Sequence, residues 1–216
     1  MPVIIGYIHV CQQGNWQITY DMIMSAVKKS GLYDNSSEIR VGVVNNLDHI
    51  IPEERFNDPK IKIIGHGSSQ LYERLTLHHL RDSSENEICQ YWYTHTKGIR
   101  YFDDHDLHKR NCVIDWIRLM IFYNIIKWET ATNCLLSNDT YGCEFSVNPC
   151  KHYSGNFWWA NCQYIRTLPS RIGGDYCDPE FWLLKRDKEI LIGNVFSSGI
   201  DGGSHYSTRV SLDNLP

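Results

Sequence analysis

Apolar residues along the chain recur in two patterns that alternate over most of its length. Short runs rich in valine and isoleucine, such as Val3–Val10, are typical of strands buried on both faces of a parallel sheet. Stretches with apolar residues three or four positions apart, such as Trp16–Lys29 before Gly31, are typical of amphipathic helices. On these grounds we expect strands at Val3–Val10, Ile39–Val44, Ile61–Ile64, Ile88–Thr94 and Thr140–Phe145, and helices at Trp16–Lys29, Tyr72–Arg81 and Val113–Cys134.

This alternation of strands and helices predicts an α/β fold with a central, mostly parallel (mixed) sheet that is flanked by helices on both faces. The 216 residues are enough for a sizeable core. No repeat, low-complexity tract or linker divides the chain. We therefore expect a single domain over residues 1–216.

Composition excludes several classes of function. The formal net charge is −4 and the basic residues are dispersed, so nothing predicts nucleic-acid binding through phosphates. No apolar run approaches the ~20 residues that span a bilayer, and the first residues lack the pattern of a signal peptide. The eight cysteines form no C-x-x-C pair, which argues against a structural zinc site or a disulfide scaffold. We expect a cytoplasmic protein with reduced thiols and no membrane span.

Polar residues follow several of the expected strands at the edge where open α/β sheets bind ligands. His9 lies at the end of the first strand, and Thr94, His95, Thr96 and Lys97 follow the fourth. The chain has neither the glycine pattern of dinucleotide-binding folds nor a P-loop. Phosphate would instead be held by Lys97 and a divalent cation.

Residues 152–160 combine small polar positions with two adjacent tryptophans. A tight turn that presents Trp158 and Trp159 beside His152 and Asn156 would suit a sugar, whose apolar face stacks on aromatic rings and whose hydroxyls need fixed partners. The alternative is that the tryptophans are core residues, which for either one alone is the commoner situation. In a strand, neighbouring side chains would point to opposite faces.

Several motifs occur together with this segment, in the order Tyr-Thr-His-Thr-Lys-Gly at 93–98, Val-Ile-Asp-Trp at 113–116, Ser-Gly-Asn-Phe-Trp-Trp-Ala at 154–160, Tyr-Ile-Arg-Thr-Leu-Pro at 164–169 and Glu-Phe-Trp at 180–182. In this order they resemble small nucleotide-sugar glycosyltransferases of GT-A type, among them a domain of a chlorella-virus protein of capsid-glycan synthesis. The resemblance implies a UDP-sugar donor, a glycan acceptor, Mn²⁺ or Mg²⁺, and a viral protein acting in host cytoplasm.

The resemblance also implies a metal site, for which this chain departs from the usual sequence. Such enzymes carry Asp-x-Asp at the end of the fourth strand, where this chain has Thr94 to Lys97. In one alternative the following loop supplies Asp104 and Asp106, and His205 completes the metal shell. In the other, His95 and Lys97 neutralise part of the phosphate charge. A solvated acidic loop remains an equally good interpretation of residues 103–106.

A catalytic base is implied at Glu180, because inverting transfer needs a carboxylate that takes the acceptor's proton. Asp178 is the alternative base, although Asp178 before Pro179 also suits the start of a helix. Acidic residues in a first helical turn favour the helix dipole without any catalytic role. His9, Tyr72 and Arg74 would hold uracil or ribose, with a buried histidine and an exposed helix start as the plain alternatives.

The function that follows is metal-dependent, inverting transfer of a hexose or deoxyhexose from a UDP-sugar to a glycan. Two alternatives from other classes remain, namely a sugar-binding module without catalysis and a metal-dependent nucleotide-sugar hydrolase. A binding module has no use for a base at Glu180, and a hydrolase would release free sugar without an acceptor.

Overall fold

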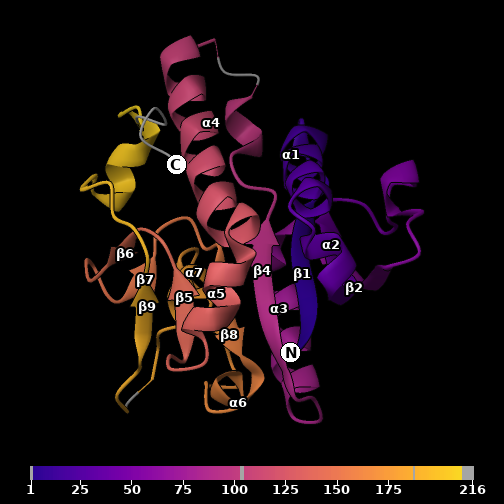
Figure 1. The fold of residues 1–216 in the computed structure, drawn as a ribbon. Helices are drawn as coiled ribbons and strands as arrows, with labels where there is room; N and C mark the ends of the chain where they lie inside the picture. Colours follow the sequence, from indigo (N-terminus) through magenta and orange to yellow (C-terminus); the bar gives the residue numbers. More distant parts are fainter. Residues whose placement is uncertain (1, 103–104, 187, 211–216) are drawn as a thin grey trace.

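A computed structural model describes residues 2–102, 105–186 and 188–210. Its centre is a seven-stranded sheet of order β3-β2-β1-β4-β8-β5-β9 (Figure 1). The first four strands in this order are parallel, whereas β8 runs antiparallel to both of its neighbours. The strands are β1 (Val3–Cys11), β2 (Ser36–Asn45), β3 (Ile61–Ser68), β4 (Cys89–His95), β5 (Thr140–Gly142), β8 (Trp158–Asn161) and β9 (Ile192–Asn194). The expected α/β fold with a mixed central sheet is confirmed.

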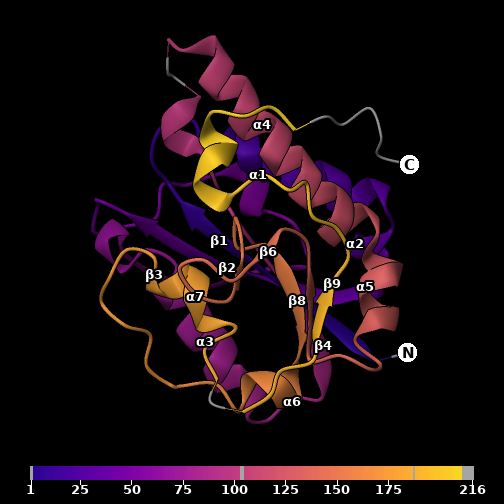
Figure 2. The ribbon, with the colours of Figure 1, turned by 90° about the vertical axis from the view of Figure 1, so that its left-hand side faces the viewer.

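Helices cover both faces of this sheet (Figures 1 and 2). One face packs against α1 (Trp16–Lys29), α4 (Leu107–Ile121) and α5 (Trp128–Cys134), and the other against α3 (Arg74–Ser84), α6 (Cys162–Ile165) and α7 (Asp178–Trp182). A short helix, α2 (Leu32–Asn35), leads into β2. Alternation along the central strand serves both layers, since Ile8 and Val10 belong to the first core and Ile5 and Tyr7 to the second.

Two expected elements are interrupted. The helix expected at Val113–Cys134 begins earlier, at Leu107, and contains a π-helical segment, Phe122–Ile126, between α4 and α5. The strand expected at Thr140–Phe145 ends at Gly142. Glu144 has a φ of 57°, and this left-handed residue turns the chain into a separate hairpin of β6 (Phe145–Ser146) and β7 (His152–Tyr153).

None of the helices among the described residues is both long enough and apolar enough to cross a membrane. The eight cysteines all carry free thiols.

Candidate active site

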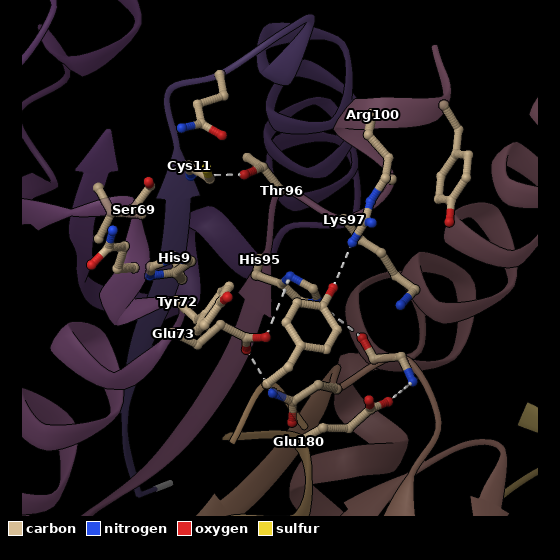
Figure 3. Close-up of a pocket in the computed structure, with 18 of the residues that line it drawn as sticks. His9, Cys11, Ser69, Tyr72, Glu73, His95, Thr96, Lys97, Arg100 and Glu180 are labelled. Carbon is tan, nitrogen blue, oxygen red and sulfur yellow. Dashed lines mark hydrogen bonds and ion pairs between the residues drawn. The ribbon is translucent and has the colours of Figure 1, made fainter. Parts of the chain in front are cut away.

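A cavity of about 340 Å³ lies at the carboxyl ends of β1 and β4, beside the turn that leads into β8 (Figure 3). This is the edge at which open α/β sheets bind ligands. Of the residues singled out in the sequence, the structure brings six together in its lining: His9, Tyr72, His95, Lys97, Asn156 and Glu180. They come from segments far apart in the chain, so the fold converts scattered residues into one site.

Lys97 supplies a buried positive charge to the cavity. Its side chain is 9% exposed, and its Nζ lies 4.0 Å from the centre of the Trp116 ring. Burial opposes the charge, but Tyr206, Glu180 and Glu73 outweigh it and raise the pKa of Lys97. Within the described part of the chain no hydrogen bond or ion pair engages the ammonium group. A protonated amine that contacts aromatic rings but has no hydrogen-bond acceptor among the described residues is suited to bind an anionic group of a ligand.

Two neutral imidazoles lie beside this charge. Burial lowers the pKa of both His9 and His95 to about 4. His95 Nε2 donates to the carbonyl oxygen of Gly155 at 3.0 Å, which leaves Nδ1 as an acceptor. His9 uses Nδ1 for a 2.8 Å contact with Thr76 Oγ1. Both rings therefore offer hydrogen bonds without adding charge.

Glu73 is the carboxylate that sequence reasoning missed. Its Oε2 accepts hydrogen bonds from the hydroxyl of Tyr93 at 2.5 Å and from Nδ2 of Asn156 at 2.6 Å. Its Oε1 lies 3.8 Å from His95 Nδ1 (Figure 3). Burial raises the pKa of Glu73, against the opposing effects of His9 and Tyr93. Its position just before α3 carried no signal in the sequence pattern.

Glu180 projects into the same cavity from the first turn of α7. Its Oε1 accepts a 2.6 Å hydrogen bond from the backbone amide of Gly155. No other hydrogen bond to this carboxylate occurs among the residues that the structure describes. Gly155 thus touches two functional side chains, donating to Glu180 through its amide and accepting from His95 through its carbonyl.

The turn at Gly155 depends on backbone conformations that few residues adopt. Gly155 has a φ of 94°, and a Cβ atom there would lie 2.3 Å from the sulfur of Met120. Asn156 follows with a φ of 57°, which asparagine tolerates better than most residues. The small and polar residues of this motif are therefore explained by the shape of the turn.

Trp158 and Trp159 do not lie in a turn that presents them to a sugar, as the sequence analysis expected. Both lie in β8, are 1% and 0% exposed, and point to opposite faces of the sheet. Trp158 stacks on Tyr93 and donates from Nε1 to Asn156 Oδ1 at 2.8 Å. Trp159 donates to the carbonyl of Asn124 at 2.6 Å. The expectation that the indole of Trp158 or Trp159 lines the pocket is wrong. The turn ends at Phe157, and both tryptophans lie in the paired strand that follows it.

Other singled-out residues support the cavity from outside its lining. Thr94 is fully buried, and His152 bonds the carbonyl of Cys150 and the hydroxyl of Ser154. Arg74 donates to three backbone carbonyls, including those of Gly173 and Asp175. Asp178 is the first residue of α7, whose N-cap is Cys177, and its Oδ2 accepts from the amide of Asp175 before the helix, so the interpretation of Asp178 as the N-cap is wrong.

Two of the three proposed metal ligands are described by the structure, and each has another partner. Asp106 accepts from the amide of Lys109 as the N-cap of α4, and His205 is fully buried against Trp116, with Nε2 3.0 Å from Glu144 Oε2. Asp104 lies outside the described residues. Among the described residues no three His, Cys, Asp or Glu side chains stand close enough to hold an ion. A metal ion held by Asp104, Asp106 and His205 therefore stays a prediction.

Aromatic side chains that the sequence analysis did not single out complete the lining. Tyr101, Tyr176 and Tyr206 surround the mouth with Arg100, whose Nη2 donates to Tyr176 Oη at 2.7 Å. Tyr101 and Tyr206 end short 3-10 helices and Tyr176 lies in a turn, and no periodic pattern marks a role for such segments. The signal that the sequence did offer for these residues was the combination of tyrosine with arginine.

Comparisons with known proteins match the fold of one solved structure and the model of one protein family. The structure is similar to that of 4-diphosphocytidyl-2C-methyl-D-erythritol synthase from Anaerococcus prevotii, with a TM-score of 0.50 and 10% identity over 98% of this chain and 94% of that chain. At this identity the likeness shows a shared fold. The comparison with curated proteins gave no match. Residues 28–171, more than half of the chain, match the family described as Domain of unknown function (DUF8361). The protein therefore belongs to the DUF8361 family.

Proposed function

We propose that the protein is a glycosyltransferase that moves a hexose or deoxyhexose from a UDP-sugar to a hydroxyl group of a glycan. The observation that carries this proposal is the pairing of Lys97 and Glu180 in one cavity. An ammonium group with no hydrogen-bond acceptor among the described residues suits the diphosphate of a donor, and a carboxylate held by one hydrogen bond among those residues suits an acceptor's proton.

The donor class has two supports. One is the resemblance of the motifs at 93–98 and 154–160 to nucleotide-sugar glycosyltransferases. The other is the shared fold with a protein whose name includes a diphosphocytidyl compound. In our proposal Lys97 binds the phosphates, Arg100 at the mouth adds a second cation, and the neutral imidazoles of His9 and His95 accept or donate hydrogen bonds to ribose or sugar hydroxyls.

The reaction assigned to Glu180 is a single displacement. The acceptor oxygen forms a bond to the anomeric carbon as the bond from that carbon to the phosphate oxygen breaks. The hydroxyl proton passes to the carboxylate of Glu180, and UDP leaves with its charge opposite Lys97. A single displacement inverts the anomeric carbon.

Replacing the carboxylate tests this proposal. Glu180→Gln keeps the size of the side chain and its acceptor for the Gly155 amide, but removes the proton acceptor. Transfer from UDP-glucose or another UDP-hexose should fall roughly 10²-fold or more, with UDP affinity nearly unchanged. Glu189→Gln, at an exposed carboxylate outside the cavity, is the matched control.

The same assay separates the alternative functions. A hydrolase would release free sugar from UDP-hexose without an acceptor. A sugar-binding module would show no turnover in the wild type. Transfer by Glu180→Gln at the wild-type rate would refute the assignment of the base.

A further inference from the structure

We propose that Tyr72 and Tyr176 form an aromatic clamp that binds a pyranose ring of the acceptor glycan, an inference that rests on the proposed transfer reaction. Both tyrosines line the cavity that contains Glu180. Their side chains are 39% and 58% exposed, although each is a large aromatic group. The two rings meet edge to face, with centroids 5.0 Å apart. An exposed aromatic pair at the mouth of a cavity is a typical feature of a binding site.

One buried guanidinium group holds both tyrosine-bearing segments. Arg74 is 8% exposed, and its Nε and Nη2 donate to the carbonyls of Gly173 and Asp175 at 2.6 and 2.5 Å. Its Nη1 donates to the carbonyl of Leu71 at 3.3 Å. Leu71 directly precedes Tyr72, and Asp175 directly precedes Tyr176. These three hydrogen bonds explain why a buried arginine lies next to the cavity without lining it.

The backbone of Tyr72 indicates that its exposure is imposed by the structure. This residue has a φ of 49° and a ψ of −132°, a conformation that favours glycine. A non-glycine residue in such a conformation costs conformational energy and is concentrated at ligand sites. The guanidinium of Arg74 lies 5.6 Å from the centre of the Tyr72 ring and supports it from the protein side.

Tyr176 is fixed at its hydroxyl end as well. Arg100 Nη2 donates to its Oη at 2.7 Å, and the guanidinium carbon lies 5.9 Å from the ring centre. The ring is thus anchored by the Asp175 carbonyl on the backbone side and by Arg100 at the tip, while much of its surface stays open. Such an anchored ring can stack on a ligand with little further loss of side-chain entropy.

The position of the clamp favours an acceptor sugar over the nucleotide base. Tyr176 leads into α7, whose first turn carries Glu180, so a ring stacked on Tyr176 lies beside the carboxylate that takes the acceptor's proton. The apolar face of a pyranose packs on an aromatic ring, and its hydroxyls find partners around the rim. The donor phosphates belong at Lys97, on β4's side of the cavity.

The experiment measures two affinities in the same variants. Binding of a panel of methyl hexopyranosides is followed by saturation-transfer NMR with and without UDP, and UDP affinity is measured by calorimetry. Tyr176→Ala should weaken pyranoside binding about tenfold, whereas Tyr176→Phe, which keeps the ring, should stay within about twofold of wild type. Both variants remove the hydroxyl that accepts from Arg100, so any effect of this lost bond on UDP affinity should be equal in the two, and Tyr176→Ala should bind UDP as Tyr176→Phe does. Tyr33→Ala, at a tyrosine on α2 away from the cavity, is the control.

Other results would overturn the clamp. Loss of UDP affinity with pyranoside binding retained would assign the ring to the base, and no change in either affinity would leave Tyr176 without a binding role. A wild type that binds no pyranoside of the panel also contradicts the proposal. Failure of the proposed function looks different, because the wild type would then bind pyranosides but not UDP.

Tyr72→Gly supplies an independent readout. Because glycine adopts this backbone conformation freely, the variant should melt at or above the wild-type temperature while binding pyranosides more weakly. A tyrosine with a purely structural role would show the reverse, a lower melting temperature and unchanged binding.

Discussion

The two halves of the sheet build the cavity in different ways. The parallel half, β3-β2-β1-β4, presents His9, His95 and Lys97 at or just beyond the ends of long, buried strands. The mixed half, β8-β5-β9, has strands of three or four residues, and its contribution comes from the turn at Gly155 and the first turn of α7. The histidines proposed to bind the donor are therefore fixed in strands, Lys97 lies in the turn directly after β4, and the proposed base is fixed by a single amide.

This difference between the halves explains why the two tryptophans next to the turn have different roles. Trp158 connects the halves, since it stacks on Tyr93 of β4 and bonds Asn156, which in turn bonds Glu73. Tyr93 closes the ring by donating to the same carboxylate oxygen. We infer that this closed network holds the turn that positions Glu180, whereas Trp159 serves the opposite core.

The largest effect on stability is expected from removing the Trp159 side chain from the core on the opposite face of the sheet. Trp159→Ala removes a fully buried indole and its bond to the Asn124 carbonyl, and should lower the free energy of unfolding by about 3–5 kcal/mol. Chemical denaturation of the variant and of Leu136→Ala, an exposed control, measures it. A loss below about 1 kcal/mol would show that the mixed half is loosely packed.

Lowering the pH should reduce stability through the two buried histidines of the parallel half, His9 and His95. The pKa of His9 and of His95 is about 4 in the folded protein, against about 6.5 in an unfolded chain. Between these values only the unfolded state takes up the protons, so stability present above pH 6.5 is lost as the pH falls toward 4, by at most about 3 kcal/mol for each histidine. Glu73, whose pKa burial raises, opposes part of this loss.

Unfolding curves at pH 7, 5.5 and 4.5 test this dependence. His95→Gln keeps a hydrogen-bond donor but cannot titrate, so its stability should change less over this range than that of the wild type. Equal slopes for the two proteins would mean that His95 is not a buried neutral imidazole.

Trp158→Phe is expected to have the smallest effect on stability. It is also the variant that tests the comparison of the two halves of the sheet most sharply. A phenyl ring can still stack on Tyr93, but part of the buried indole and its hydrogen bond to Asn156 are lost, at a cost of about 1–2 kcal/mol. If the network positions Glu180, kcat should fall severalfold while UDP affinity is unchanged. An unchanged kcat beside the same loss of stability would make Trp158 a core residue only.

The parallel half could be predicted from the sequence because its signals are local. Runs such as Ile39–Val44 and Ile61–Ile64 fall within β2 and β3, and Trp16–Lys29 is matched by α1. The helix to Cys134 and the strand to Phe145 were expected to be longer, because neither a π-helical segment nor a left-handed Glu144 leaves a periodic mark in the sequence.

The site was only partly predictable for a similar reason. His95, Lys97, Asn156 and Glu180 were found through motifs, and the structure brings them to one cavity. Glu73 was missed because its role depends on Tyr93 and Asn156, which the fold brings to it from other segments. The tryptophans were misplaced because the ladder between β4 and β8 is a tertiary feature.

The most direct test of the account is a calorimetric titration of UDP into the wild type, Lys97→Met and Lys29→Met, each with Mn²⁺ and with EDTA. Lys29 is exposed on α1 and serves as the control for lost charge. We predict saturable UDP binding by the wild type and by Lys29→Met, weakened about 10- to 100-fold in Lys97→Met because a charged contact is lost. Absence of UDP binding under both conditions, or equal binding by Lys97→Met, would contradict the account.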